Sequence, residues 1–299
     1  MASFWDVQRA NKTKSWLLIA LVIPIVAGLV WFAGYVFDGG GWILPFAIII
    51  SILYAAGGYF YGDKLVLAMH GARAADERKD AYICNTVEGL ALAAQIPKPK
   101  VYIIDDPSPN AFATGRDPQH ASIAVTSGLL AIMDRAELEG VLGHEMSHIR
   151  NFDSRFMTLT IVLVGLVAIL ANMIGRGMMF GGGSRDRERG NGLVMILGLL
   201  MIILAPILAT LVQLAISRSR ERLADASAAQ LTRNPGGLAD ALEKLKGTPP
   251  LRSASPTTAG LFISDPVHGG GKKGIGQSLS GLFSTHPPLE ERIKALRAM

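Results

Sequence analysis

The stretch Gly143-His144-Glu145-Met146-Ser147-His148 (GHEMSH) decides how the rest of the chain is interpreted. It lies in a modestly amphipathic segment, residues 136–150, which the pattern predicts to be a helix with Asp134 as its N-cap. On a helix, His144 and His148 are one turn apart on the same face, so both imidazoles can reach one metal ion. Glu145 lies beside them, positioned to take a proton from the attacking water. Chance would place such a motif in a chain of this composition only about 0.004 times, so coincidence is a poor explanation.

A catalytic zinc usually has three protein ligands and one open position, so a third ligand is needed. No third histidine follows at the short spacing that metzincins use, which favours a carboxylate further along the chain. The segment 217–225 (SRSRERLAD) supplies Glu221, and Asp225 lies one turn later, where it can accept a hydrogen bond from a ligand histidine. The alternative is a solvated charged turn, since Arg218 and Arg222 lie at salt-bridge spacing from Glu221. Beside the histidine pair, the ligand interpretation is favoured.

Composition excludes several classes of function. Half of the 299 residues are hydrophobic and only 18% are charged, which is typical of a membrane protein. The net charge of +5 forms no basic stripe and no nucleic-acid-binding motif is present, so we expect no nucleic acid as a partner. The GGGKK run at 269–273 lacks the preceding strand and following Ser or Thr of a phosphate loop, so we expect no nucleotide. Cys84 is the single cysteine and is expected to be buried, and His70, His120 and His268 are expected to be structural or exposed.

Apolar runs predict where the chain meets the bilayer. Residues 16–37 and 42–61 are each long enough to cross the hydrocarbon core, which takes about 20 helical residues, and they predict a transmembrane hairpin. Residues 156–174 and 193–216 are also free of charge and predict a second hydrophobic hairpin. Flanking Lys and Arg place both termini and residues 62–155 on the cytoplasmic side. Whether the second pair fully spans stays open, because full spanning would place the arginines that begin at Arg176 outside.

Around the second hairpin, the sequence predicts a catalytic domain built from two separate segments. The expected fold is mainly α: transmembrane helical hairpins with an α+β, gluzincin-like metalloprotease domain that contains a small sheet. The order is a tail and hairpin at 1–61, a first catalytic segment at 62–155, the second hairpin at 156–216, and a further catalytic segment at 217–299. The predicted elements are helices at 80–95, 217–232, 237–246 and 290–297, strands at 101–104 and 122–126, and a mobile loop at 247–281.

Several motifs in order make the chain resemble the HtpX-type membrane zinc metalloproteases, relatives of the CAAX prenyl proteases of the endoplasmic reticulum. The resemblance rests on PNAFATG (109–115), GHEMSH, the 221–225 segment and STHPP (284–288), together with the apolar runs. It implies that Asn110 lies beside the cleft and hydrogen-bonds the substrate or tetrahedral intermediate. It also implies that His286 approaches the metal, to hold the intermediate or to block the zinc in a resting state. From the residues alone, Asn110 would pass as a turn residue and His286 as a surface-loop residue.

The expected function is therefore a membrane-bound zinc endopeptidase with one zinc per chain. Only seven residues separate His148 from the third apolar run, so the zinc must lie within a few helical turns of the bilayer. Its expected partners are protein or peptide substrates, above all membrane proteins, and the lipid bilayer. The resemblance implies quality control of damaged or misfolded proteins under stress, in the bacterial inner membrane. Two alternatives remain: a prenyl-protein-type processing protease, and a non-catalytic membrane scaffold whose structural metal would need a fourth protein ligand.

Overall fold

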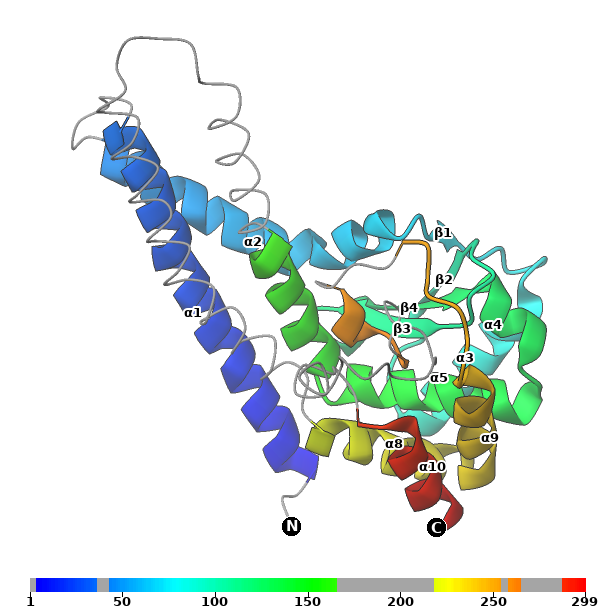
Figure 1. Cartoon of the computed structure of the whole chain (residues 1–299). Helices are drawn as coiled ribbons and strands as arrows, with labels where there is room; N and C mark the ends of the chain where they lie inside the picture. Colours follow the sequence, from blue (N-terminus) through cyan, green and yellow to red (C-terminus); the bar gives the residue numbers. More distant parts are fainter. Residues whose placement is uncertain (1–3, 37–42, 166–217, 254–257, 265–286) are drawn as a thin grey trace, which may run out of the picture.

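The computed structural model of the chain describes residues 4–36, 43–165, 218–253, 258–264 and 287–299. Helices dominate: two long ones lie beside a body of shorter helices and a small sheet, and their far ends project beyond that body (Figure 1). The mainly α membrane fold with a small mixed sheet is the one expected from the sequence.

The N-terminal hairpin consists of α1 (Phe4–Val36) and α2 (Ile43–Met69), which pack against each other. Both helices are long and apolar enough to cross a bilayer, and α2 leaves large apolar side chains such as Phe46, Ile49 and Leu53 exposed. The predicted first hairpin is confirmed as a pair of helices, although both helices extend past the apolar runs. The turn predicted between them lies outside the described residues.

The sheet has four strands in the order β1-β2-β4-β3. Its strands are β1 (Arg73–Ala74), β2 (Lys100–Ile104), β3 (Ala111–Gly115) and β4 (Ala121–Thr126). The neighbours β2 and β4 are parallel, whereas the other two pairs are antiparallel. Strands β2 and β4 are confirmed predictions. Strand β3 was not predicted, because its sequence AFATG has only one β-branched residue, and pairing with β4 supplies what local propensity lacks.

The two faces of the sheet contact different regions of the molecule, since alternate residues of a strand point to opposite sides. Ala111 and Ala113 of β3 belong to the core formed with the shorter helices of the body, and Phe112 belongs to the core shared with the hairpin. The short side chains on β3 let the GHEMSH helix lie close to this strand. The helices of the body are α3 (Ala81–Ala94), α4 (Ser127–Ile132), α5 (Arg135–Arg150), α8 (Arg218–Thr232), α9 (Pro235–Leu245) and α10 (Leu289–Arg297).

Helix α5 begins where the sequence predicts. Asp134 accepts a hydrogen bond from the Glu137 N–H, and the Glu137 carboxylate accepts one from the Asp134 N–H, which is a capping box. Lys244 of α9 contacts the same Glu137 carboxylate at 2.6 Å. At Gly140 an added Cβ would lie 2.7 Å from the Leu238 nitrogen, so only glycine lets α9 approach α5 this closely. Helix α5 is therefore fixed by its cap and by close packing against α9.

Residues 258–264 of the predicted loop at 247–281 are irregular, as predicted, but they are packed into the core, so the expectation of a mobile segment is wrong for them. Phe262 is fully buried and forms an antiparallel bridge with Phe112, while the Ile263 N–H donates to the Ala111 carbonyl at 3.0 Å. The many Pro and Gly residues indicated irregular backbone, but the apolar Leu261, Phe262 and Ile263 fill space beside β3. Residues 265–286 lie outside the described portion of the chain.

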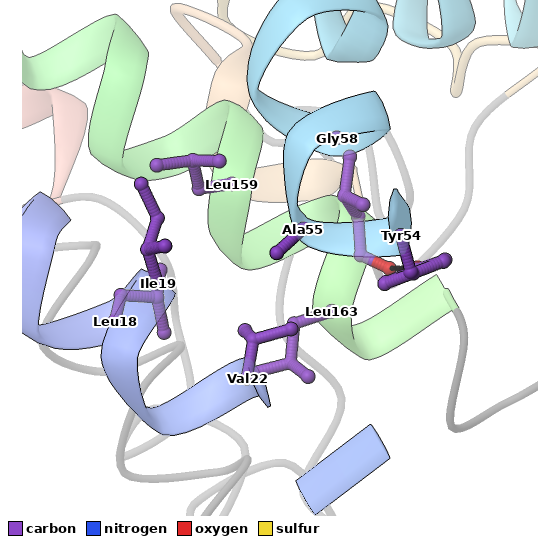
Figure 2. Close-up of a pocket in the computed structure, with 9 residues that line it drawn as sticks. Leu18, Ile19, Val22, Tyr54, Ala55, Gly58, Leu159 and Leu163 are labelled. Atoms are coloured by element: carbon purple, nitrogen blue, oxygen red, sulfur yellow. Dashed lines mark hydrogen bonds between the residues drawn. The ribbon is translucent and has the colours of Figure 1, made fainter. Parts of the chain in front are cut away.

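A helix over 153–165 begins the predicted second hairpin and packs beside the first one. Leu159 and Leu163 of this helix, Leu18 and Val22 of α1, and Ala55 of α2 line a small apolar pocket (Figure 2). The Tyr54 hydroxyl donates to the Val162 carbonyl at 2.7 Å. Residues 166–217 lie outside the described ranges, so the rest of the second hairpin stays a prediction.

Candidate metal centre

Three predicted ligand residues converge at the middle of the catalytic body. His144 and His148 come from α5 and Glu221 comes from the first turn of α8, and all three are buried. The two Nε2 atoms lie 3.1 Å apart. The Glu221 oxygens lie 3.6 Å from Nε2 of His144 and 3.5 Å from Nε2 of His148. Packing of α5 against α8 thus brings together candidate ligands separated by more than seventy residues of sequence.

This arrangement fits a zinc ion. Tetrahedral zinc with bonds of about 2.0–2.2 Å to nitrogen and oxygen places its ligand atoms about 3.3–3.6 Å from one another, close to the observed spacing. Both Nδ1 atoms face carboxylates, which favours a proton on each Nδ1 and leaves each Nε2 as the atom that can bind a metal ion. Without a metal ion, a proton on Nε2 of His148 joins the two rings as an N–H···N hydrogen bond of 3.1 Å, and a metal ion that replaces this proton can bind both nitrogens. The donor set matches that of zinc sites with two histidines and one glutamate.

On the His144 side, the supporting carboxylate is the predicted one. Nδ1 of His144 lies 3.0 Å from Asp225, whose two oxygens accept hydrogen bonds from Arg292 at 2.7 and 2.9 Å. Burial alone would raise the pKa of Asp225, but the charge of Arg292 and the hydrogen bonds from His144 and Arg292 lower it to about 2. Asp225 therefore stays ionised and holds the His144 ring in one tautomer. Arg292, on α10, has no signal in the sequence that predicts this contact.

On the His148 side, the supporting carboxylate was not predicted. Nδ1 of His148 lies 3.2 Å from Asp153, which follows the end of α5. The second Asp153 oxygen accepts a hydrogen bond from Asn11 of α1 at 2.7 Å and lies 3.5 Å from Arg220. The available signal was a carboxylate five residues after a ligand histidine, at the start of the next helix.

The electrostatics of the two rings differ. Burial lowers the pKa of His144. Burial acts in the same direction on His148, but the hydrogen bond with Asp153 and the negative charge of Glu221 outweigh it and raise the pKa to about 9. The negative charge that favours a proton on His148 also attracts a divalent cation to the three ligands.

Glu145 is buried beside the ligands, as the motif predicts. Burial raises the pKa of Glu145 to about 7, although the positive charge of His148 opposes the rise. Among the described residues, no donor reaches either Glu145 oxygen at a normal hydrogen-bond distance and angle. A buried carboxyl group that titrates near neutral pH is suited to take and return a proton.

Asn110 lies at the start of β3, where its amide joins two segments. Its Nδ2 donates to the Ser264 carbonyl at 3.1 Å, and its Oδ1 accepts from the Ala111 N–H at 3.1 Å. The side chain therefore attaches residues 258–264 to the strand next to α5, and whether it also contacts substrate remains a proposal. His286, the other residue implied by the resemblance, lies outside the described residues.

The remaining histidines in the described ranges of the chain have ordinary surroundings. His70 is buried against Phe112 and Phe262, with Nδ1 2.9 Å from the Ser253 hydroxyl, and His120 is exposed and pairs with Asp117. Within those ranges, His144, His148 and Glu221 form the one group of His, Cys, Asp or Glu side chains close enough to share a metal ion. Cys84 is buried, as expected, and His268 lies outside the described residues.

Comparison with known proteins gives concordant results. The family model of Peptidase family M48 matches residues 77–299. The chain is 47% identical over 304 residues to the "Protease HtpX homolog" of Streptococcus pneumoniae, with 99% of each protein covered. It is 46% identical over 299 residues to the "Protease HtpX homolog" of Limosilactobacillus fermentum, with 97% of each covered. Among solved structures, S. mikatae Ste24p has a similar fold, with a TM-score of 0.50 and 17% identity; the match covers 97% of this chain and 66% of that one.

Proposed function

The chain belongs to peptidase family M48 and has two helices that can span a membrane, and on that premise we propose that it is a zinc-dependent endopeptidase with His144, His148 and Glu221 as ligands. One observation carries the proposal: three buried ligand atoms lie 3.1–3.6 Å apart, with a carboxylate behind each imidazole. A purely structural zinc site would need a fourth protein ligand. No fourth His, Cys, Asp or Glu joins this group among the residues that the structure describes, which favours catalysis over a scaffold.

The chemistry divides between the ion and the side chains around it. When bound, zinc supplies Lewis acidity, which polarises the scissile carbonyl and makes water a stronger acid. Glu145 accepts the proton of the attacking water and returns it to the leaving amine nitrogen. Asp225 and Asp153 keep the Nδ1 protons in place, so that both Nε2 lone pairs point toward the ion. Peptide hydrolysis follows without an acyl-enzyme.

The position of the centre next to the bilayer supports membrane proteins as substrates. Helix α5 ends at Arg150, and the helix that follows packs directly on α1 and α2, both of which can span the membrane. We propose that the enzyme removes damaged or misfolded membrane proteins, as a component of quality control under stress. We further propose that it resides in a bacterial inner membrane with the catalytic body in the cytoplasm.

A cleavage assay with casein and a membrane-protein substrate tests the proposed activity. Wild type is expected to cleave both, to lose activity with a chelator, and to regain it with zinc. Glu145→Gln is expected to be inactive. Glu139→Gln, the same substitution on a more exposed site of α5, is the matched control and is expected to behave like wild type. Activity that resists the chelator, or that survives Glu145→Gln, would contradict the proposal.

Reporter fusions test the proposed orientation separately. A reporter inserted at 39–41 is expected outside the cytoplasm, and fusions near Lys100 and at the C-terminus are expected inside. A probe at Gly182 decides whether the second hairpin spans. Labelling of the C-terminus from outside intact cells would overturn the orientation without affecting the proposed chemistry.

A further inference from the structure

The polar N-terminal end of α1, residues 4–15, contacts the turn that directly follows the GHEMSH helix. Gln8 Nε2 donates to the Arg150 carbonyl at 2.7 Å. Asn11 Nδ2 donates to the Asn151 carbonyl at 2.9 Å and to Asp153 Oδ1 at 2.7 Å. Lys12 places its ammonium 4.3 Å from the centre of the Phe152 ring. A helix that continues into the membrane thus contacts the main chain and side chains beside the metal centre.

The turn held by these contacts has an unfavourable backbone conformation. Phe152 has φ of 61°, a left-handed value that a bulky residue rarely adopts. Such a conformation persists only where the surrounding structure imposes it. The two hydrogens of the Asn11 amide bond to Asn151 and Asp153, one on each side of Phe152, so a single side chain bridges the strained residue.

The same amide sets the orientation of the carboxylate behind His148. One Asp153 oxygen accepts from Asn11 and the other lies 3.2 Å from Nδ1 of His148. Asn11 is itself 2% exposed, so water does not readily replace it in this role. We infer that Asn11 is a positioning residue for the metal centre: it holds the strained turn and Asp153, and through Asp153 it orients His148 toward zinc. This inference rests on the proposed function.

Packing further along α1 keeps Asn11 in place. About two and three helical turns beyond Asn11, Leu18 and Val22 line a pocket together with Leu159 and Leu163 of the helix that begins at Asp153 (Figure 2). The two helices therefore lie together both beside the metal centre and within the hydrophobic layer. A membrane-spanning helix accordingly supports the metal ligands, in addition to anchoring the protein.

Zinc affinity of the full-length protein tests this inference without relying on activity. Zinc dissociation constants are measured by competition with a chromophoric chelator for wild type, Asn11→Ala and the matched control Gln8→Ala. The control removes the other amide that α1 donates to this turn and leaves Asp153 untouched. Each substitution is also made in the Asp153→Asn background. The visible spectrum of the cobalt-substituted proteins and the thermal unfolding of the zinc-free proteins are recorded in parallel.

Asn11→Ala is expected to weaken zinc binding about tenfold, which is the lower end of the range for residues that support a metal ligand through hydrogen bonds. It is also expected to alter the visible spectrum of the cobalt-substituted protein. Gln8→Ala is expected to retain wild-type affinity, and Asn11→Ala is expected to add little once Asp153 is Asn. Equal affinities for Asn11→Ala and wild type, or additive losses with Asp153→Asn, would overturn the inference.

If Asn11→Ala does not fold, Asn11→Gln displaces the amide by one methylene and must weaken zinc binding without lowering the unfolding temperature of the zinc-free protein. Unchanged zinc affinity of this variant would overturn the inference in the same way. Failure of wild type to bind zinc would instead contradict the proposed function.

Discussion

The two histidines of the metal centre are supported by different regions of the molecule. Behind His144 lies Asp225, paired on both oxygens with the buried Arg292, and all three residues come from helices of the catalytic body. Behind His148 lies Asp153, whose closest partner on its far side is the neutral amide of Asn11 from the membrane helix α1. Breaking a buried ion pair costs about 3–5 kcal/mol, whereas a neutral hydrogen bond contributes about 0.5–1.5 kcal/mol. Because the ion pair of Asp153 with Arg220 is longer, at 3.5 Å, than that of Asp225 with Arg292, changes on the His144 side should cost more folding stability than changes on the His148 side.

The largest expected effect is that of Arg292→Met. The substitution leaves the buried Asp225 carboxylate without its cation, so the free energy of unfolding should fall by about 3–5 kcal/mol. Denaturant unfolding of the detergent-solubilised, zinc-free protein measures this. Arg297→Met, also on α10, removes only an exposed pair with Asp240 and should cost no more than about 1 kcal/mol. Equal free energies of unfolding for the two variants would contradict the claim that the buried pair behind His144 stabilises the fold.

Asp225→Asn should have the next largest effect. It keeps the shape and an acceptor oxygen but removes the charge, so zinc affinity and activity should fall about 10–100-fold, with partial rescue by added zinc. Glu221→Gln should be more damaging, because it alters a group placed to bind the ion directly. Activity against free zinc, measured for both variants and wild type, makes the comparison. Wild-type behaviour of Asp225→Asn at every zinc concentration would reduce Asp225 to a structural partner of Arg292.

Asp153→Asn should weaken zinc binding about tenfold, with a smaller loss of stability than Asp225→Asn. The reason is that Arg292 donates to both Asp225 oxygens at 2.7 and 2.9 Å, whereas Arg220, a charged partner of the far Asp153 oxygen, lies 3.5 Å from it. Zinc competition and thermal unfolding of the two variants side by side decide this. A loss of stability for Asp153→Asn as large as that for Asp225→Asn would show that both sides depend on buried charge.

The smallest expected effect is that of Lys12→Met, which removes the cation over the Phe152 ring. An exposed cation–π contact contributes about 0.5–1 kcal/mol, so the unfolding free energy should fall by no more than that. Lys14→Met, at an exposed site on the same helix, is the control. If Lys12→Met lowers zinc affinity as strongly as Asn11→Ala, the turn depends on the whole end of α1 rather than on one amide.

The residues of the metal centre that could be predicted from sequence differ from those that could not in how they are spaced along the chain. The predicted residues lie at helical spacing: His144 and His148 are one turn apart, and so are Glu221 and Asp225. Helical spacing reports which side chains share a face, and the structure places all four together at the packed surface of α5 and α8. Asp153 was within reach of such reasoning but required knowing that α5 ends at Arg150 and that the chain then turns back.

The unpredicted contacts join segments with no local signal. Arg292 reaches Asp225 across 67 residues and Asn11 reaches Asp153 across 142, and neither pairing follows from spacing. Strand β3 was missed because its small residues have weak strand propensity, and its edge is covered by Phe262 and Ile263 from a segment predicted to be a mobile loop. The Arg292 and Asn11 contacts and strand β3 all depend on tertiary packing, which cannot be inferred from local sequence patterns.

Zinc content measured beside peptide cleavage tests the central claim most directly. Wild type and Glu145→Gln are predicted to contain one zinc per chain, with cleavage only in wild type, because Glu145 handles the proton and is not a ligand. Glu221→Gln is predicted to lose both zinc and cleavage. Cleavage by Glu145→Gln, or a folded Glu145→Gln protein without zinc, would contradict the assignment of these residues.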